Sequence, residues 1–317
     1  MHRKSLLRRL VLAAVCVTAL AVPVALGSTA SAAIAGPVTW QVRVGAESPD
    51  MAVSAMKFLP REVWVDVGDT VRWTAGSAEP HTVTFLAPGT SLPAFNPFDP
   101  SQTTLQGASS YDGTALASSG IVATQPIFVF TDPASGYNLT FTATGDFTYY
   151  CLLHGVMMTG VVHVRAAGTA YPYTQQDYNR AGNQQAAAAL LAGRTAYRQA
   201  RQAHATTGSQ VQVGIDGEGF GVSRFVRDNV VVHVGQTVSF TAGPGAPHTV
   251  TFGQEPPGLA ILAPSGDPTH FGGGDLNSGV LTPGVPFTVT FTAAGKYHYI
   301  CAIHDGMGMV GDVVVVP

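Results

Sequence analysis

Short apolar segments that alternate with polar residues recur along the chain, and turn residues separate them. The segment VWVDVGDTVRWTA, at 63–75, predicts a strand, a Gly-Asp turn and a second strand, and HTVTF, at 81–85, alternates in the same way. GVVHVR at 160–165 and GDVVVV at 311–316 are typical of closing strands. Short strands at this spacing, with no amphipathic helix between them, favour an antiparallel β-sandwich with Greek-key connections.

The whole pattern occurs twice, which indicates a tandem repeat. FLPREVWVDVGDTVRWTAGSAEPHTVTF from Phe58 aligns without a gap with FVRDNVVVHVGQTVSFTAGPGAPHTVTF from Phe225. FTATGDFTYYCLLHG from Phe141 aligns with FTAAGKYHYICAIHD from Phe291, so the offset falls from 167 to 150 residues. The first copy therefore has 17 more residues between His81 and Cys151 than the second has between His248 and Cys301. The excess falls around SLPAFNPFDPSQTTLQGASS, which predicts a long surface loop.

An Ala-, Gln-, Leu- and Arg-rich segment between the copies predicts a linking helix from about Gln184 to Ala205. Whether this helix packs between the domains or acts as a spacer is left open by its sequence. We therefore predict an all-β chain of two tandem sandwich domains joined by a helical linker. Its expected parts are a signal peptide at 1–32, a first domain at 33–166, the linker at 167–207 and a second domain at 208–317.

The first 32 residues have the three parts of a secretory signal peptide. A basic stretch, MHRKSLLRR, precedes an apolar one interrupted by Pro23, and Ala30-Ser31-Ala32 fits an A-x-A cleavage site. A retained anchor is the alternative, which Pro23 and the cleavage site disfavour. No other apolar run is long enough to span a membrane, so we expect a secreted, extracytoplasmic product. Cleavage would leave 12 basic and 19 acidic residues, a charge of about −7, which disfavours nucleic acid as a partner.

The cysteines point to chemistry. Cys16 lies in the signal segment, whereas Cys151 and Cys301 each lie in one copy, three residues before a His and close to a Met. Two cysteines of a secreted chain usually pair, but this setting indicates metal ligands instead. Two His, one Cys and a weak axial Met form the blue-copper arrangement. His81 and His248, in EPHTVTF and APHTVTF, supply the second His of each set.

Both copies resemble the plastocyanin/azurin family of cupredoxins, the small blue copper proteins. The matching segments are the G-D/Q-T-V turn, P-H-T-V-T-F, Y-x-C-x-x-H and the M-x-G that opens the last strand. The resemblance covers most of 36–166 and 208–317, and excludes the helix and the long loop. It implies one copper, cycling between Cu(I) and Cu(II), in each domain.

The resemblance also implies the ligands. The second copy has plastocyanin-like spacing, and the first has one residue fewer before M-x-G, so Met158 is favoured there while amicyanin-like spacing would select Met157. The implied metal ligands are His81, Cys151, His154 and Met158 in the first domain, and His248, Cys301, His304 and Met309 in the second. By the same resemblance, His154 and His304 would lie near an apolar surface and serve as electron ports.

Electron transfer, without enzymatic activity, is the function that this resemblance implies, with a redox partner that the sequence does not identify. A two-domain copper enzyme needs further His ligands, typically a His beside the Cys or a His-x-His pair. Here Tyr150 precedes Cys151, Ile300 precedes Cys301, and the chain has no His-x-His. Extracellular copper sequestration or delivery remains an alternative, although no Met-rich or His-rich tract supports it. Adhesive domains with vestigial ligands are the non-metal alternative.

Overall fold

The computed structural model describes residues 36–126, 130, 132–203 and 208–317. The expected signal peptide, with Cys16 and the A-x-A site, lies outside these residues. Residues Ala33–Pro317 form one compact unit. In the part of the chain that is described, no helix combines the length and the apolar character needed to cross a membrane.

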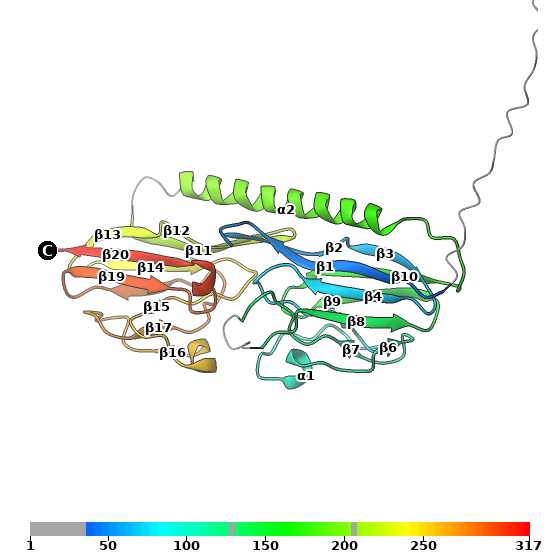
Figure 1. Ribbon diagram of the computed structural model, residues 1–317. Helices are drawn as coiled ribbons and strands as arrows, with labels where there is room; N and C mark the ends of the chain where they lie inside the picture. Colours follow the sequence, from blue (N-terminus) through cyan, green and yellow to red (C-terminus); the bar gives the residue numbers. More distant parts are fainter. Residues whose placement is uncertain (1–35, 127–129, 131, 204–207) are drawn as a thin grey trace, which may run out of the picture. The chain divides into compact units, whose positions relative to one another are not determined.

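The first repeat folds as a sandwich of two sheets (Figure 1). One sheet has the order β2-β1-β4-β8-β6 and the other the order β3-β10-β9-β5-β7. The bounds of the first group are β2 Val53–Leu59, β1 Thr39–Glu47, β4 Thr70–Ala75, β8 Gly136–Phe141 and β6 Ser110–Tyr111. Those of the second group are β3 Glu62–Asp66, β10 Gly155–Arg165, β9 Gly145–Cys151, β5 Thr84–Phe85 and β7 Ala117–Ser118.

The second repeat has the same architecture. Its sheets have the orders β12-β11-β14-β18 and β13-β20-β19-β15-β17-β16. The bounds of the first group are β12 Phe220–Val226, β11 Gln210–Gly217, β14 Thr237–Ala242 and β18 Phe287–Thr290. Those of the second are β13 Asn229–His233, β20 Val310–Val316, β19 Gly295–Ile300, β15 Thr251–Phe252, β17 Leu276–Ser278 and β16 Pro264–Ser265.

The fold class expected from the sequence is confirmed, with one correction to the pairing. Most strand pairs are antiparallel, but β1 pairs with β4, β3 with β10, and β6 with β8 in parallel, and the second repeat has parallel pairs β11–β14 and β13–β20. Successive strands such as β2 and β3 belong to opposite sheets of the sandwich, so strands that are not consecutive become neighbours in one sheet. The sheets are therefore mixed rather than antiparallel throughout.

Each sandwich buries its own aromatic core. Trp73, Phe85 and Tyr149 are fully buried in the first, and Phe240, Phe252 and Tyr299 are their counterparts in the second. The Tyr149 ring lies 5.0 Å from that of Phe85 and 5.3 Å from that of Trp73, and the Tyr299 ring lies 5.1 Å from that of Phe240 and 5.4 Å from that of Phe252. Aromatic side chains at such separations attract each other beyond simple burial. Packing of Tyr149 and Tyr299 in these cores holds the ends of β9 and β19 in place, and the loops that follow begin there.

The two sandwiches share one continuous sheet. Strand β12 pairs antiparallel with β2, with Phe220 opposite Ala55 and Val222 opposite Val53. This pairing joins a five-stranded sheet of the first repeat to a four-stranded sheet of the second, which makes one nine-stranded sheet. Helix α2 (Gln175–Ala203) packs against this sheet, over β1, β2, β11 and β12 (Figure 1). Short helices α1 (Pro100–Thr103), η1 (Gly258–Leu262) and η2 (Asp305–Met307) lie in loops.

The linking helix starts earlier than its composition suggests, at Gln175 rather than near Gln184. The backbone N–H and the hydroxyl of Thr174 both donate to the Asp177 carboxylate, so the two residues cap the first turn. The helix then turns Tyr178, Gly182, Ala186, Ala189 and Gly193 towards the sheet. It therefore covers the junction of the two domains, and the spacer alternative does not describe it.

Candidate metal centres

The three side chains expected to hold the first metal converge in the core of the first sandwich. His81 sits in a short bridge to Val122, Cys151 ends β9, and His154 lies in the loop before β10. The Nδ1 atoms of the two histidines are 3.2 Å apart, and the Cys151 Sγ is 3.2 Å from Nδ1 of His154 and 3.8 Å from Nδ1 of His81. All three side chains are buried. Two imidazole nitrogens and one sulfur thus face one point.

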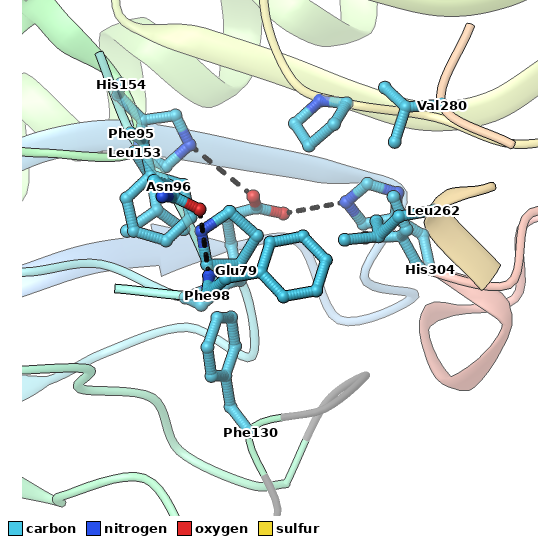
Figure 2. A pocket seen from close by; sticks show the side chains of 14 residues that line it. Glu79, Phe95, Asn96, Phe98, Phe130, Leu153, His154, Leu262, Val280 and His304 are labelled. Carbon is cyan, nitrogen blue, oxygen red and sulfur yellow. Dashed lines mark hydrogen bonds and ion pairs between the residues drawn. The ribbon is translucent and has the colours of Figure 1, made fainter. Parts of the chain in front are cut away.

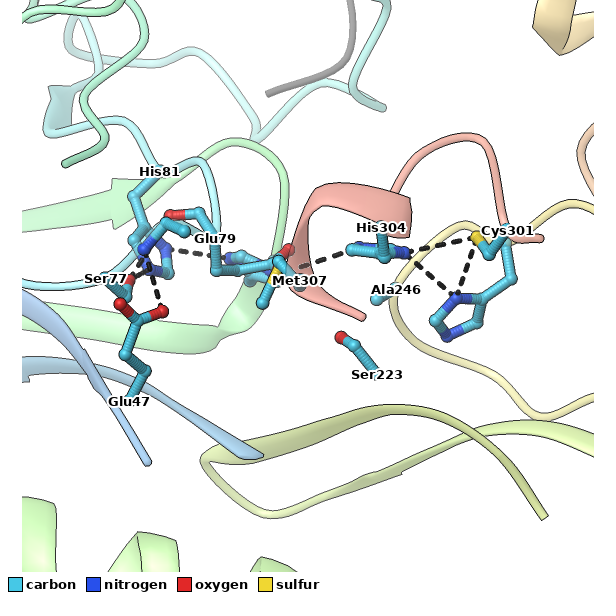
Figure 3. Close-up of polar contacts among 12 residues, drawn as sticks. Glu47, Ser77, Glu79, His81, Ser223, Ala246, Cys301, His304 and Met307 are labelled. Carbon is cyan, nitrogen blue, oxygen red and sulfur yellow. Dashed lines mark hydrogen bonds and ion pairs between the residues drawn. The ribbon is translucent and has the colours of Figure 1, made fainter. Parts of the chain in front are cut away.

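The second repeat has the same geometry. The Cys301 Sγ lies 3.4 Å from Nδ1 of His304 (Figure 3). The Nδ1 of His248 lies 3.2 Å from that of His304 and 3.7 Å from the Cys301 Sγ. In each group the donor atoms all lie within 4.8 Å of one another. One ion can span such a set, because metal–nitrogen and metal–sulfur bonds are about 2.0–2.3 Å long. A thiolate with two imidazoles is the donor set that suits copper.

Backbone hydrogen bonds fix the cysteine in each site. The Thr82 N–H donates to the Cys151 Sγ over 3.4 Å, while the Leu152 N–H donates to the Thr82 hydroxyl over 2.8 Å. Thr249 makes the same two contacts, with Cys301 at 3.4 Å and Ala302 at 2.8 Å. A donor to the sulfur withdraws electron density from it and orients it, which is how residues around a metal site tune the metal.

A glycine in the first strand of each repeat makes room for the upstream histidine. Gly45 and Gly214 lie where the β1–β2 and β11–β12 ladders shift register, and both have positive φ, +72° and +68°. A Cβ on Gly45 would lie 2.6 Å from Nε2 of His81, and one on Gly214 would collide with Nε2 of His248. The sequence analysis missed these bulge glycines, although VGAE and VGID align in the two copies and could have indicated them.

The methionine candidates differ in burial. Met158 is 1% exposed and belongs to the same core cluster as Cys151, whereas Met157 is 47% exposed. In the second repeat Met309 is fully buried in the cluster that contains Cys301. Met307 is also buried, but it packs against Ala78 of the first repeat in a separate cluster.

Electrostatics favour the metal-binding form of the cysteines. Burial raises the pKa of Cys151, but His154 and His81 beside the sulfur outweigh it, and the pKa lies well below its usual range. Burial raises the pKa of Cys301 as well, but His304 and His248 outweigh it and hold that pKa well below its usual range. Burial lowers the pKa of His154, and the nearby Cys151 and Glu79 overcome this and raise it to about 10. The lowered pKa values therefore favour the thiolate, which is the form of cysteine that binds a metal.

A carboxylate that the sequence analysis did not single out connects the two sites. Glu79 is 2% exposed, and its Oε1 lies 3.4 Å from Nε2 of His154 while its Oε2 lies 3.4 Å from Nε2 of His304 (Figure 2). Burial raises the pKa of Glu79, but contact with His154 and His304 holds it well below its usual range. In the other repeat Ala246 occupies the aligned position. This difference between the copies is the feature of the sequence that could have pointed to Glu79.

The expected apolar surroundings of His154 and His304 take the form of a cavity between the repeats. It has a volume of about 350 Å³, and the two imidazoles and Glu79 are part of its wall (Figure 2). Leu153, Leu262, Val280 and Ile303 supply apolar wall, and the long loop of the first repeat adds Phe95 and Phe98. Both histidines are nonetheless at most 5% exposed, so neither lies on an open outer surface.

Comparisons with known proteins agree with this geometry. Residues 46–165 and 209–316 both match the family model described as copper binding proteins, plastocyanin/azurin family. The chloroplastic plastocyanin of Chlamydomonas reinhardtii is 36% identical over 107 residues, which are 33% of this chain and 65% of that protein. The plastocyanin of Mercurialis perennis is 36% identical over 93 residues, 29% of this chain and 86% of that protein. The chain thus spans just under two thirds of the algal relative.

The matches to solved structures each cover about a third of the chain. A purple cupredoxin from Nitrosopumilus maritimus is 24% identical with a TM-score of 0.23, and the match covers 34% of this chain and 100% of that one. Oxidised plastocyanin from Dryopteris crassirhizoma is 26% identical with a TM-score of 0.24, over 34% of this chain and 99% of that one.

Proposed function

Because the chain belongs to the plastocyanin/azurin family of copper-binding proteins, we propose that it holds one type 1 copper in each sandwich domain and transfers electrons. The observation that carries the proposal is the pair of buried His–Cys–His groups with matching geometry. His81, Cys151 and His154 would hold one copper, and the second set is His248, Cys301 and His304. We place the domains at 33–166 and 208–317, with the linker at 167–207.

The chain's own residues favour a carrier of electrons. When bound, copper supplies a one-electron couple between Cu(I) and Cu(II). The ligand atoms already converge, and the buried threonines hold each sulfur in place, so little has to move when the charge changes. A rigid site of this kind lowers the reorganisation that accompanies electron transfer.

Burial of the ligands also favours electron transfer over copper delivery. A protein that passes its ion to a partner must expose ligands, because the partner has to replace them one by one. His81, His154, His248 and His304 are each at most 5% exposed. Electron transfer by a protein that keeps its copper is therefore better supported than delivery. Sequestration of copper is the second candidate function. From residues 1–32 we propose export from the cytoplasm, and the redox partner remains unidentified.

Titration of the mature chain with copper(II), followed by optical spectroscopy, tests the proposal. We expect a strong thiolate-to-copper band that saturates at two coppers, and Cys151→Ser and Cys301→Ser should each lose one share of it. A reversible redox couple, with no loss of copper to a chelator, would separate electron transfer from delivery. Absence of the band in the wild type would overturn the proposal, and a single share would restrict it to one domain.

We further propose Met158 and Met309 as axial ligands. The burial of Met158 beside Cys151, against the exposed side chain of Met157, supports this assignment. A weak axial ligand tunes the potential, so Met158→Gln should lower the potential and shift the band of the first site while the second stays unchanged. Met157→Gln is the matched control and should leave both sites unaltered. The opposite pattern would assign Met157.

A further inference from the structure

Glu79 is a buried carboxylate that contacts a histidine of each candidate metal site. It precedes Pro80 and His81 in the first repeat, yet its carboxylate lies between the ligand loops of both repeats. Its two oxygens approach one histidine each, at 3.4 Å, and Oε2 has no other polar partner among the described residues. A buried carboxylate is costly unless it is paired, so this position is built around the two imidazoles.

The contacted atoms are the ring nitrogens that face away from the cysteine sulfur. In both His154 and His304 the Nδ1 atom points at the cysteine sulfur, while Nε2 points at Glu79. Carboxylates commonly bind the free ring nitrogen of a metal-ligating histidine, which orients the ring and makes it a stronger donor. Here a single carboxylate occupies that position for two histidines that belong to different sites.

We propose that Glu79 couples the two copper sites, so that one electron passes between them along the path His154–Glu79–His304. The proposal rests on the proposed function, since it requires copper in both sites. With copper bound, the transfer would balance within the protein, because the electron lost by one site would be the electron gained by the other. The path between the rings crosses only two non-covalent gaps, each of 3.4 Å.

The repeats are held together where this path crosses between them. Arg224 donates to the carbonyl oxygens of Met307 over 2.7 Å and of Asp50 over 2.5 Å. It thereby joins the loop after β1 to the 3₁₀ turn that follows His304. Met307 packs against Ala78, next to Glu79 (Figure 3). The loops on the two sides of Glu79 are therefore joined by the Arg224 side chain and by the packing of Met307.

Copper-free protein provides the first arm of the test. Glu79→Gln keeps the shape of the side chain and removes its charge. We expect the Nε2 resonances of both His154 and His304 to shift in nitrogen-15 spectra, with little change at His81. Glu47→Gln is the matched control, because Glu47 accepts a hydrogen bond from the Ala78 N–H beside the first site and contacts neither of the bridged rings. A shift at only one bridged ring would overturn the bridge.

The second arm uses the copper-loaded full chain in a Met309→Gln background, which sets the potentials of the two sites apart. After a flash-generated reductant supplies less than one electron per protein, we expect the two thiolate bands to re-equilibrate in a first-order phase independent of protein concentration. Glu79→Gln should slow this phase by about 10–100-fold, the range that loss of such a partner causes, and Glu47→Gln should not. Glu79→Asp, which keeps the charge but cannot span both rings, should slow it as well.

The outcomes separate the two proposals. An exchange rate in Glu79→Gln or Glu79→Asp equal to that of the parent would overturn the coupling while both blue-copper bands remain, so the proposed function would stand. Loss of the bands in the parent protein itself would overturn the proposed function, and the coupling with it. If Glu79→Gln does not fold, Glu79→Asp decides alone.

Discussion

Single residues determine whether the ligands can converge at all. His81 and His248 reach their sites only because Gly45 and Gly214 present no side chain at a bulge of the neighbouring strand. Positive φ suits glycine as well, since an L-residue in that conformation costs about 1–2 kcal/mol. Glycine at positions 45 and 214 therefore meets two requirements, a backbone with positive φ and the space that the imidazole needs.

Gly214→Ala is expected to weaken copper binding at the second site, because its Cβ would collide with Nε2 of His248. We expect the band of that site to require about 10–100-fold more copper for half-saturation, as when a supporting contact of a ligand is lost. Gly235→Ala is the control. It has a similar φ, +84°, and open space around it, so it should cost stability but no copper affinity. Equal copper binding by both variants would contradict the steric explanation.

At the scale of elements, helix α2 depends on small residues on one face. Its buried positions include two glycines, where the backbone of the helix comes close to the sheet. A Cβ on Gly182 would lie 2.9 Å from the backbone carbon of Leu59 and 3.1 Å from the Pro60 nitrogen. Neither backbone atom can move aside as a side chain would, so the helix itself has to shift.

Gly182→Ala should therefore lower the free energy of unfolding, against the gain of about 1 kcal/mol that alanine normally brings to a helix. Overpacking of this kind costs about 1–3 kcal/mol. Gln184→Ala, at an exposed position of the same helix, is the control and should be neutral or slightly stabilising. Denaturant unfolding of both variants measures the difference. A stabilised Gly182→Ala protein would show that the helix does not pack this closely.

At the scale of the whole molecule, the two repeats act as one body around a shared carboxylate. Pairing of β2 with β12 makes one sheet of two, α2 covers the junction, and Arg224 ties the loops beside the metal sites. These features place His154 and His304 on either side of Glu79. Neither repeat alone contains the path from His154 to His304, so the coupling experiment on Glu79 requires the full chain.

Much of the molecule follows from the sequence. Alternating apolar positions identified the strands, the repeat identified two sandwiches, and the spacing of Cys151, His154 and His81 identified which side chains would meet. Such inferences succeed because strand alternation and short loops are local properties. The boundaries of the domains and the assignment of the metal ligands of both sites, the axial methionines included, stay predictions.

Only the tertiary structure decided how the two repeats meet. The pairing of β2 with β12, the burial of Met307 against Ala78 and the position of Glu79 all depend on contacts between residues far apart in the chain. The pattern of apolar and polar residues does not predict such contacts, because nothing in the local sequence of either partner distinguishes it. Glu79, for example, is one acidic residue in a turn. Sequence thus determined two copper-site motifs, and the fold determined that one carboxylate lies between them.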